Sequence, residues 1–360
     1  MRMHVILIAA AAVAIAAHAA TAADTGNVPA TTAQVDKRFE ALDHRLDQLE
    51  KAMDDILWYH RVGDVADIDK VFITGPPRAK VDNPTAMGAN NPLKFWVYTF
   101  VPRGLDTTRK HPLIVLPHGG VHANFTTYHT HIIRELMAQG YVVAAPEYRG
   151  STGYGKGFWE AIDYGGREID DNHAARDFMV ENFDYVDGAR VGLLGWSHGG
   201  LIALMDAFDN PDDYAAVFAG VPVSDLVARM GYYDDEYRDQ FSASYHLGKT
   251  AMDDVAEYRK RSPVNHAAKL RVPLLIHTNT NDDDVNVLEV EHLIRALKAE
   301  GKQFEHEIFQ DVPGGHSFDR IDTRHARQTR VKIWKFLARH LRPERPITSL
   351  GELDKAAYRR

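Results

Sequence analysis

A serine with a glycine two residues before it and another two residues after it, at a predicted strand-to-helix junction, is the strongest chemical signal in this chain of 360 residues. Residues 195–199 read Gly-Trp-Ser-His-Gly, after an apolar run at 191–194 and before a helix-like run at 201–205. Glycines on both sides allow a tight, strained turn that holds the hydroxyl of Ser197 at the carboxyl end of a sheet. The pattern therefore predicts a nucleophile, although a motif this short also arises by chance.

A serine hydroxyl becomes a useful nucleophile when a histidine accepts its proton and a carboxylate orients that histidine. The chain offers Asp282 in a polar turn after a predicted buried strand, and His316 in a glycine-rich loop after the last predicted strand. We take Asp282 as the orienting acid and His316 as the general base. Asp283 and Asp284 are better explained as parts of a solvated turn that caps the next helix.

Acyl transfer also needs hydrogen-bond donors for the negative charge that develops on the substrate oxygen. A buried strand at residues 112–117 runs into His118, Gly119 and Gly120. We expect the backbone N–H groups of Gly119 and Gly120 to approach that oxygen, with the N–H of His198 beside the nucleophile as the further donor. The alternative for the two glycines is a simple turn.

Taken together, five segments resemble the catalytic domain of the prolyl oligopeptidase family of serine peptidases. The resemblance spans roughly residues 111–341, and one departure is His277-Thr278, where the family usually has His-Gly. It implies an α/β-hydrolase fold, peptide substrates, and the Asp of an Asp-x-x-Val segment as the acid, which is Asp282 here. The segments are His118 to Gly120, residues 148–155 (Tyr-Arg-Gly-Ser-Thr-Gly-Tyr-Gly), residues 195–200 (Gly-Trp-Ser-His-Gly-Gly), Asp282-x-x-Val285, and residues 315–318 (Gly-His-Ser-Phe).

Well-known members of that family carry an N-terminal β-propeller over the active site. Residues 23–110 are too few for even a four-bladed propeller at roughly 40 residues per blade. We therefore expect a cap formed by an insertion at residues 225–269 to be the cover of this site.

Predicted strands alternate with predicted helices through the rest of the chain, which indicates an α/β fold with a mostly parallel sheet covered by helices on both faces. We assign residues 66–342 to this catalytic domain. The remaining residues, 343–360, are polar, and we expect them to form a frayed C-terminal tail.

Aromatic and histidine side chains near the predicted site are candidates for contacts with substrate. Tyrosines of the cap would line a pocket, although tyrosines this dense more often join a helical cap to the protein surface. The candidates are His118, His122, Phe125, Tyr148, Trp196, Tyr232 and Tyr233.

The first residues indicate the compartment. Residues 1–22 have a basic start, an apolar core and a small-x-small cleavage site, which together predict a secretory signal peptide and a periplasmic or secreted protein, with no membrane association after cleavage. The chain has no cysteine, so the fold relies on its core for stability. A net charge of −8 without a basic cluster argues against a nucleic-acid partner. We expect no metal and no cofactor.

Residues 23–65 are predicted to contain one amphipathic helix with Thr31 or Thr32 as N-cap. Its apolar residues follow a strict 4-3 spacing of about three heptads, the lower limit for a coiled coil. Two interpretations are equally open: a homodimer through this helix, or packing of the apolar stripe against the chain's own domain. The stripe is Val35, Phe39, Leu42, Leu46, Leu49, Met53 and Ile56.

These observations predict an exported serine hydrolase that cleaves amide bonds of short peptides through Ser197, His316 and Asp282. The same constellation serves a carboxylesterase acting on small acyl or aryl esters. A catalytically silent binding protein of the same fold is a more distant alternative.

Overall fold

The computed structural model describes residues 31–81 and 83–358, so the predicted signal peptide at residues 1–22 lies outside the described residues. The chain divides into two compact units after Glu40. Of the first unit, the structure describes residues 31–40, which are exposed and contain the first turns of a helix. No helix in the described ranges has the length and hydropathy needed to cross a membrane.

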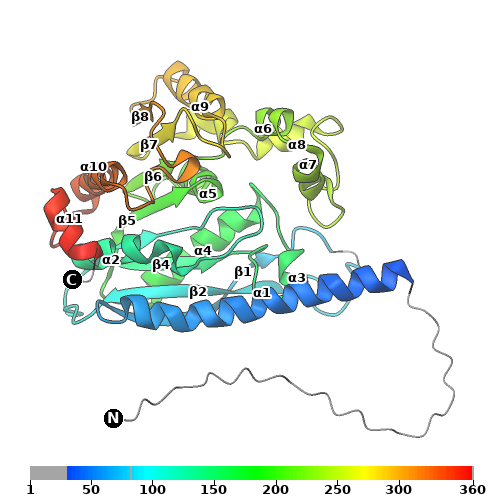
Figure 1. The fold of residues 1–360 in the computed structure, drawn as a ribbon, viewed down its shortest axis with the longest axis horizontal. Coiled ribbons are helices and arrows are strands. Elements are labelled where there is room, and N and C mark those ends of the chain that lie inside the picture. Colours follow the sequence, from blue (N-terminus) through cyan, green and yellow to red (C-terminus); the bar gives the residue numbers. More distant parts are fainter. Residues whose placement is uncertain (1–30, 82, 359–360) are drawn as a thin grey trace, which may run out of the picture. The chain divides into compact units, whose positions relative to one another are not determined.

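A single sheet forms the centre of the second unit (Figure 1). Its strand order is β1-β2-β4-β3-β5-β6-β7-β8; β1 and β2 are antiparallel to their neighbours, and the strands from β4 to β8 run parallel. The predicted α/β class with a mostly parallel sheet is confirmed. The strands are β1 (Ala66–Pro77), β2 (Pro92–Pro102), β3 (His111–Val115), β4 (Val142–Glu147), β5 (Val186–Trp196), β6 (Ala216–Gly220), β7 (Leu274–Asn279) and β8 (Glu305–Phe309).

Helices cover both faces of the sheet because successive strand residues point to opposite sides. In β3 and β5, Val115 and Leu193 belong to one core cluster, whereas Ile114 and Leu194 belong to the other. The first cluster also contains residues of α4 (Arg167–Asn182), α5 (His198–Asp209) and α9 (Val287–Ala299). The second contains residues of α1 (Thr32–Val62), α2 (Thr130–Gln139), α10 (Arg324–Leu341) and α11 (Leu350–Ala357).

The connection between β6 and β7 is the longest excursion from the sheet that follows the nucleophile. It contains the short helices α6 (Leu226–Tyr232), α7 (Asp235–Ser242) and α8 (Val255–Lys260), followed by the 3-10 helix η2 (Pro263–Lys269). These elements occupy the segment that the sequence assigns to a cap. The other short helices are η1 (Thr127–His129), α3 (Lys156–Trp159) and η3 (Gly315–Ser317).

Helix α1 begins with a capping box. The Thr31 hydroxyl accepts the N–H of Gln34 at 3.3 Å, and the Gln34 side-chain oxygen accepts the N–H of Thr31 at 2.9 Å. This agrees with Thr31 as one of the two predicted N-caps.

The face of α1 that packs on the domain carries Lys51, Trp58 and Val62, which are all buried. In Figure 1 the helix runs alongside β2, where the Trp58 ring contacts Phe100 with centroids 5.0 Å apart. The apolar stripe is on the other face, and its side chains are 37–71% exposed. Packing of the stripe against its own domain, one of the two interpretations of the sequence, is therefore wrong.

The C-terminal segment also differs from its prediction. Residues 350–357 form helix α11, which buries its own Leu353 and Ala357, and Ile347 just before it is buried as well. Ser349 and Glu352 form a capping box that starts this helix. The prediction of a frayed tail was wrong because buried apolar residues are interspersed among the polar ones.

Candidate active site

Ser197 lies between β5 and α5 in a backbone conformation that side chains rarely adopt. Its φ is 59° and its ψ −126°, and its N–H donates to the carbonyl of Gly220 on β6 at 2.9 Å. Its own carbonyl accepts the N–H groups of Gly200 and Leu201 in α5, at 3.0 and 3.1 Å. Hydrogen bonds to strand and helix thus hold a strained residue in place at the carboxyl end of the sheet.

The flanking glycines are required by space. A Cβ on Gly195 would lie 2.0 Å from the carbonyl oxygen of Gly199, and a Cβ on Gly199 would lie 2.3 Å from that of Pro117. Neither backbone atom can yield without moving the turn. The small-residue pattern that identified the motif in the sequence therefore has a direct steric cause.

Asp282 and His316 meet at the same edge of the sheet, beyond β7 and β8. Both carboxylate oxygens of Asp282 lie 2.9 Å from Nδ1 of His316. Oδ1 also accepts the N–H groups of Asp284 and Val285, each at 2.9 Å, which fixes the carboxylate in its turn. The Asp282 side chain is fully buried, whereas the His316 side chain is 16% exposed. A carboxylate on Nδ1 leaves Nε2 as the nitrogen that accepts a proton.

The two neighbouring carboxylates, Asp283 and Asp284, make other contacts. Asp283 accepts the backbone N–H of His316 at 3.0 Å and so orients the loop, without contacting the imidazole in any hydrogen bond of the described residues. Asp284 pairs with the buried guanidinium of Arg229 at 2.5 Å. Because Arg229 is on α6, this ion pair joins the cap segment to the turn that holds Asp282.

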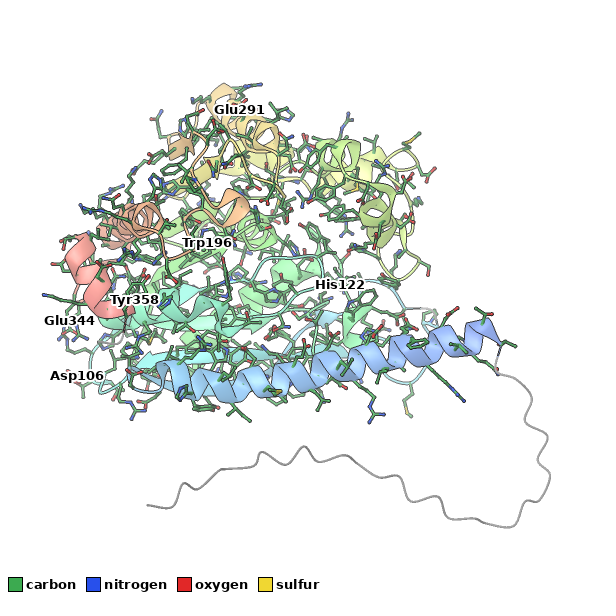
Figure 2. The ribbon with its side chains drawn as sticks, viewed as in Figure 1. Asp106, His122, Trp196, Glu291, Glu344 and Tyr358 are labelled. Carbon is green, nitrogen blue, oxygen red and sulfur yellow. The ribbon has the colours of Figure 1, made fainter. Side chains whose placement is uncertain are left out.

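A buried hydrogen bond joins the serine turn to the histidine loop. Trp196, labelled in Figure 2, donates from Nε1 to the Asp319 carboxylate at 2.9 Å. Trp196 precedes Ser197, and Asp319 follows His316 by three residues. The contact therefore constrains the spacing between these two segments.

The loop after β3 passes directly beside the serine. A Cβ on Gly119 would lie 3.2 Å from Cβ of Ser197, so a larger residue here would crowd the serine. Gly120 has a positive φ of 87°. The N–H of His198 is in the first turn of α5, where N–H groups have no partner within the helix. Two of the predicted donors, Gly119 and His198, therefore lie directly beside the serine, and Gly120 follows in the same loop.

The His198 side chain holds this loop through a hydrogen bond to Gly120. Its Nδ1 lies 2.9 Å from the carbonyl oxygen of Gly120, and its Nε2 lies 3.1 Å from Oε1 of Glu168. Burial lowers the pKa of His198 to about 3 and raises the pKa of Glu168 to about 8. At neutral pH a protonated Glu168 donates to Nε2, and the neutral imidazole donates from Nδ1 to Gly120. The Tyr164 ring stacks on His198 at 3.6 Å.

A second buried group supports the same loop from helix α1. Nζ of Lys51 lies 2.6 Å from the Glu147 carboxylate at the end of β4 and 2.5 Å from the carbonyl oxygen of Phe125. Glu147 in turn accepts the N–H of Phe125 at 3.2 Å and lies 3.5 Å from Nε2 of His118. The helix before the sheet therefore contributes a charge that fixes the loop carrying Gly119.

Replacing Lys51 by methionine is expected to destabilise the fold by about 3–5 kcal/mol, because it leaves Glu147 as an unpaired charge in the interior. Urea unfolding measures this as a lower transition midpoint. Lys37→Met, which removes the same charge from an exposed position of the same helix, should change the free energy of unfolding by less than about 0.5 kcal/mol. Equal effects of the two variants would contradict the role given to Lys51.

Most of the predicted substrate contacts are buried. Phe125 is fully buried and stacks on Trp58 at 5.3 Å, and Trp196 is buried with its Nε1 bonded to Asp319. Tyr148 and His118 are also buried, and the Tyr148 hydroxyl donates to the His118 carbonyl at 2.8 Å. As pocket walls these four predictions were wrong, because position next to a motif does not reveal which way a side chain packs.

The remaining predicted contacts are partly accessible. His122 stacks on Trp159 at 3.7 Å, and its Nδ1 lies 3.0 Å from the Gly150 carbonyl oxygen. Tyr232 and Tyr233 join the cap to the turn after β7: the Tyr233 hydroxyl donates to Asp284 at 2.8 Å, and the Tyr232 hydroxyl to Glu289. These two tyrosines therefore connect the cap to other elements of the domain.

Sequence reasoning missed Glu168, Lys51 and Glu147. Glu168 is 30 residues from His198, and Glu147 is distant in sequence from Lys51. No local pattern distinguishes these residues from surface charges, because their partners come from other elements.

Comparisons with known proteins identify the family and the fold. A family model described as "Prolyl oligopeptidase family" matches residues 127–344. The chain is 27% identical over 267 residues to the acylamino-acid-releasing enzyme of Arabidopsis thaliana, an alignment that covers 72% of this chain and 34% of that enzyme. It is 30% identical over 239 residues to the "Uncharacterized peptidase YuxL" of Bacillus subtilis (strain 168), covering 66% of this chain and 35% of that protein.

Solved structures show the same fold. The acylaminoacyl peptidase of Pyrococcus horikoshii aligns with a TM-score of 0.63 at 19% identity, over 80% of this chain and 44% of that one. The dipeptidyl peptidase 4 of Porphyromonas gingivalis aligns with a TM-score of 0.61 at 24% identity, over 77% and 36%. The chain spans about a third of the length of the curated relatives described above.

Proposed function

Because the chain belongs to the prolyl oligopeptidase family of serine peptidases, we propose that it is a serine peptidase that hydrolyses amide bonds of short peptides. The relative from Arabidopsis thaliana is named as an acylamino-acid-releasing enzyme. An acylated aminoacyl amide is therefore the first substrate class to test.

In the proposed mechanism, His316 Nε2 removes the proton from the Ser197 hydroxyl as its oxygen attacks the substrate carbonyl carbon. Asp282 holds the imidazole in the tautomer with hydrogen on Nδ1 and stabilises the imidazolium that forms. The backbone N–H groups of Gly119, Gly120 and His198 stabilise the oxyanion. The imidazolium then protonates the leaving amine, and a water molecule activated by His316 releases the acyl group from Ser197.

One observation carries this proposal: a strained serine and a carboxylate-bound histidine stand at the same edge of one sheet. The serine has a φ of 59°, and the Asp282 carboxylate lies 2.9 Å from Nδ1 of the histidine. Strain at a buried turn is kept where the rest of the structure determines it, and it concentrates at functional sites. Support for amide bonds as the target comes from the family.

Purified protein assayed side by side on acetyl-alanyl p-nitroanilide and p-nitrophenyl acetate tests the bond type. We expect turnover of the anilide, with the ester also hydrolysed because the acyl-enzyme is common to both reactions. Ester hydrolysis without detectable anilide turnover across a panel of acylated and free aminoacyl anilides would replace the peptidase proposal with a carboxylesterase.

A further inference from the structure

Helix α1 presents a continuous apolar stripe to solvent. Exposed apolar side chains in a row mark interaction surfaces more often than scattered single ones do. Each of the seven side chains is more than a third exposed, with fractions from 37% to 71%. They are Val35, Phe39, Leu42, Leu46, Leu49, Met53 and Ile56.

The opposite face of the helix packs against the domain, so the stripe cannot turn toward the core. Lys51 is bound to Glu147, and the Trp58 indole stacks on Phe125. His44, one heptad before Lys51, contacts the Trp159 ring with centroids 5.7 Å apart. These contacts fix the rotation of the helix about its own axis. The stripe is therefore held facing outward.

The spacing of the stripe identifies the kind of partner. Intervals of four and three residues assign Phe39, Leu46 and Met53 to heptad position a. Val35, Leu42, Leu49 and Ile56 then occupy position d. A surface with this repeat fits another helix with the same repeat, and leucine at the two central d positions, Leu42 and Leu49, is typical of a two-stranded coil.

The flanking charges identify the partner and its direction. Position g carries Arg38 and Arg45, and position e carries Asp36, Asp43 and Glu50, all exposed. In a parallel pair, each g residue faces the e residue five positions further along the other helix, which brings Arg38 to Asp43 and Arg45 to Glu50. An antiparallel pair would bring arginine against arginine and carboxylate against carboxylate. The helix is thus complementary to a parallel copy of itself.

We propose that α1 joins two copies of this chain as a parallel two-stranded coiled coil over residues 35–56. The domain-facing side of the helix keeps its contacts in this dimer, because positions a, d, e and g differ from those of His44, Lys51 and Trp58. The proposal does not depend on the chemistry assigned to Ser197.

Because the sequence has no cysteine, a single introduced cysteine can form a disulfide only with the same residue of another copy, which gives a direct test. In a parallel coil, a d residue lies beside the same residue of the other copy, so Leu42→Cys in the full chain should form an interchain disulfide under mild oxidation. Ala41→Cys, its exposed neighbour at position c, points away from the seam and should remain a single chain on a non-reducing gel. Equal cross-linking of the two variants would overturn the proposal.

Light scattering during size-exclusion chromatography supplies the second measurement. Wild-type protein should have twice the mass of one chain, and a single-chain mass at every concentration would overturn the dimer.

Reversing the charges at position g tests the pairing. The double variant Arg38→Glu with Arg45→Glu should have half the wild-type mass, since carboxylates then face carboxylates. Mixing that variant with Asp43→Arg plus Glu50→Arg should restore the doubled mass, and failure to restore it would contradict the charge pairing. Melting curves of the surface variants check that each is folded.

Discussion

Ser197→Ala is expected to lower kcat by at least about three orders of magnitude, because loss of a nucleophile removes covalent catalysis and leaves the contribution of the oxyanion donors and of binding. The measurement is initial rates on the anilide substrate with matched concentrations of wild-type and variant protein. Melting curves should be similar, since the serine carbonyl and N–H, which carry the turn's hydrogen bonds, are unchanged.

The control for this variant is Ser244→Ala, which removes a hydroxyl from an exposed position between α7 and α8. It should leave kcat and KM within experimental error of wild type. Full activity in the Ser197 variant would contradict the mechanism as a whole, whereas a silent binding protein would show no turnover in the wild type either.

Asp282→Asn should lower kcat by about 10⁴-fold, because the amide no longer fixes the tautomer of His316 with hydrogen on Nδ1 and no longer stabilises the imidazolium. The expected result rests on the short contact of both carboxylate oxygens with that nitrogen. Steady-state kinetics should place the loss in kcat, with KM little changed, since the Asp282 side chain is fully buried and acts through His316.

Asp283→Asn is the matched control, with the same chemical change one residue further along the same turn. Asp283 accepts the backbone N–H of His316, and an asparagine oxygen can accept it as well. We expect a loss of no more than roughly tenfold, since one hydrogen bond contributes about 1 kcal/mol. If the Asp283 variant loses more activity than the Asp282 variant, the assignment of the acid is wrong.

The parts of the fold predicted from sequence are those determined by local pattern. Short, continuous apolar runs predict the parallel strands, because a strand covered on both faces needs apolar residues on both sides. The glycines around Ser197 predict the tight turn because nearby backbone leaves no room for a Cβ at Gly195 or Gly199. The Ser-x-x-Glu spacing of Ser349 and Glu352 is a sequence signature of a helix start, and α11 begins there.

The parts that sequence reasoning missed depend on contacts between distant residues. From its sequence, the apolar stripe of α1 could pack either in the core or against a partner. Lys51 and Trp58 determine the outcome, because they are buried on the other face of the helix. Likewise, Phe125 follows the loop after β3 and was predicted to be a pocket wall, yet Trp58 covers it. Burial of Glu168 against His198 requires two helices to meet. Such pairings have no local signature.

The central claim is that Ser197 is the nucleophile, and covalent labelling tests it most directly. A fluorophosphonate forms a stable bond with an activated serine hydroxyl, so intact-mass spectrometry of the treated protein should show one adduct per chain, and peptide mapping should locate it at Ser197. Ser197→Ala should remain unlabelled under the same conditions. A wild-type protein that hydrolyses its substrate but carries no adduct, or carries it on another residue, would contradict the account.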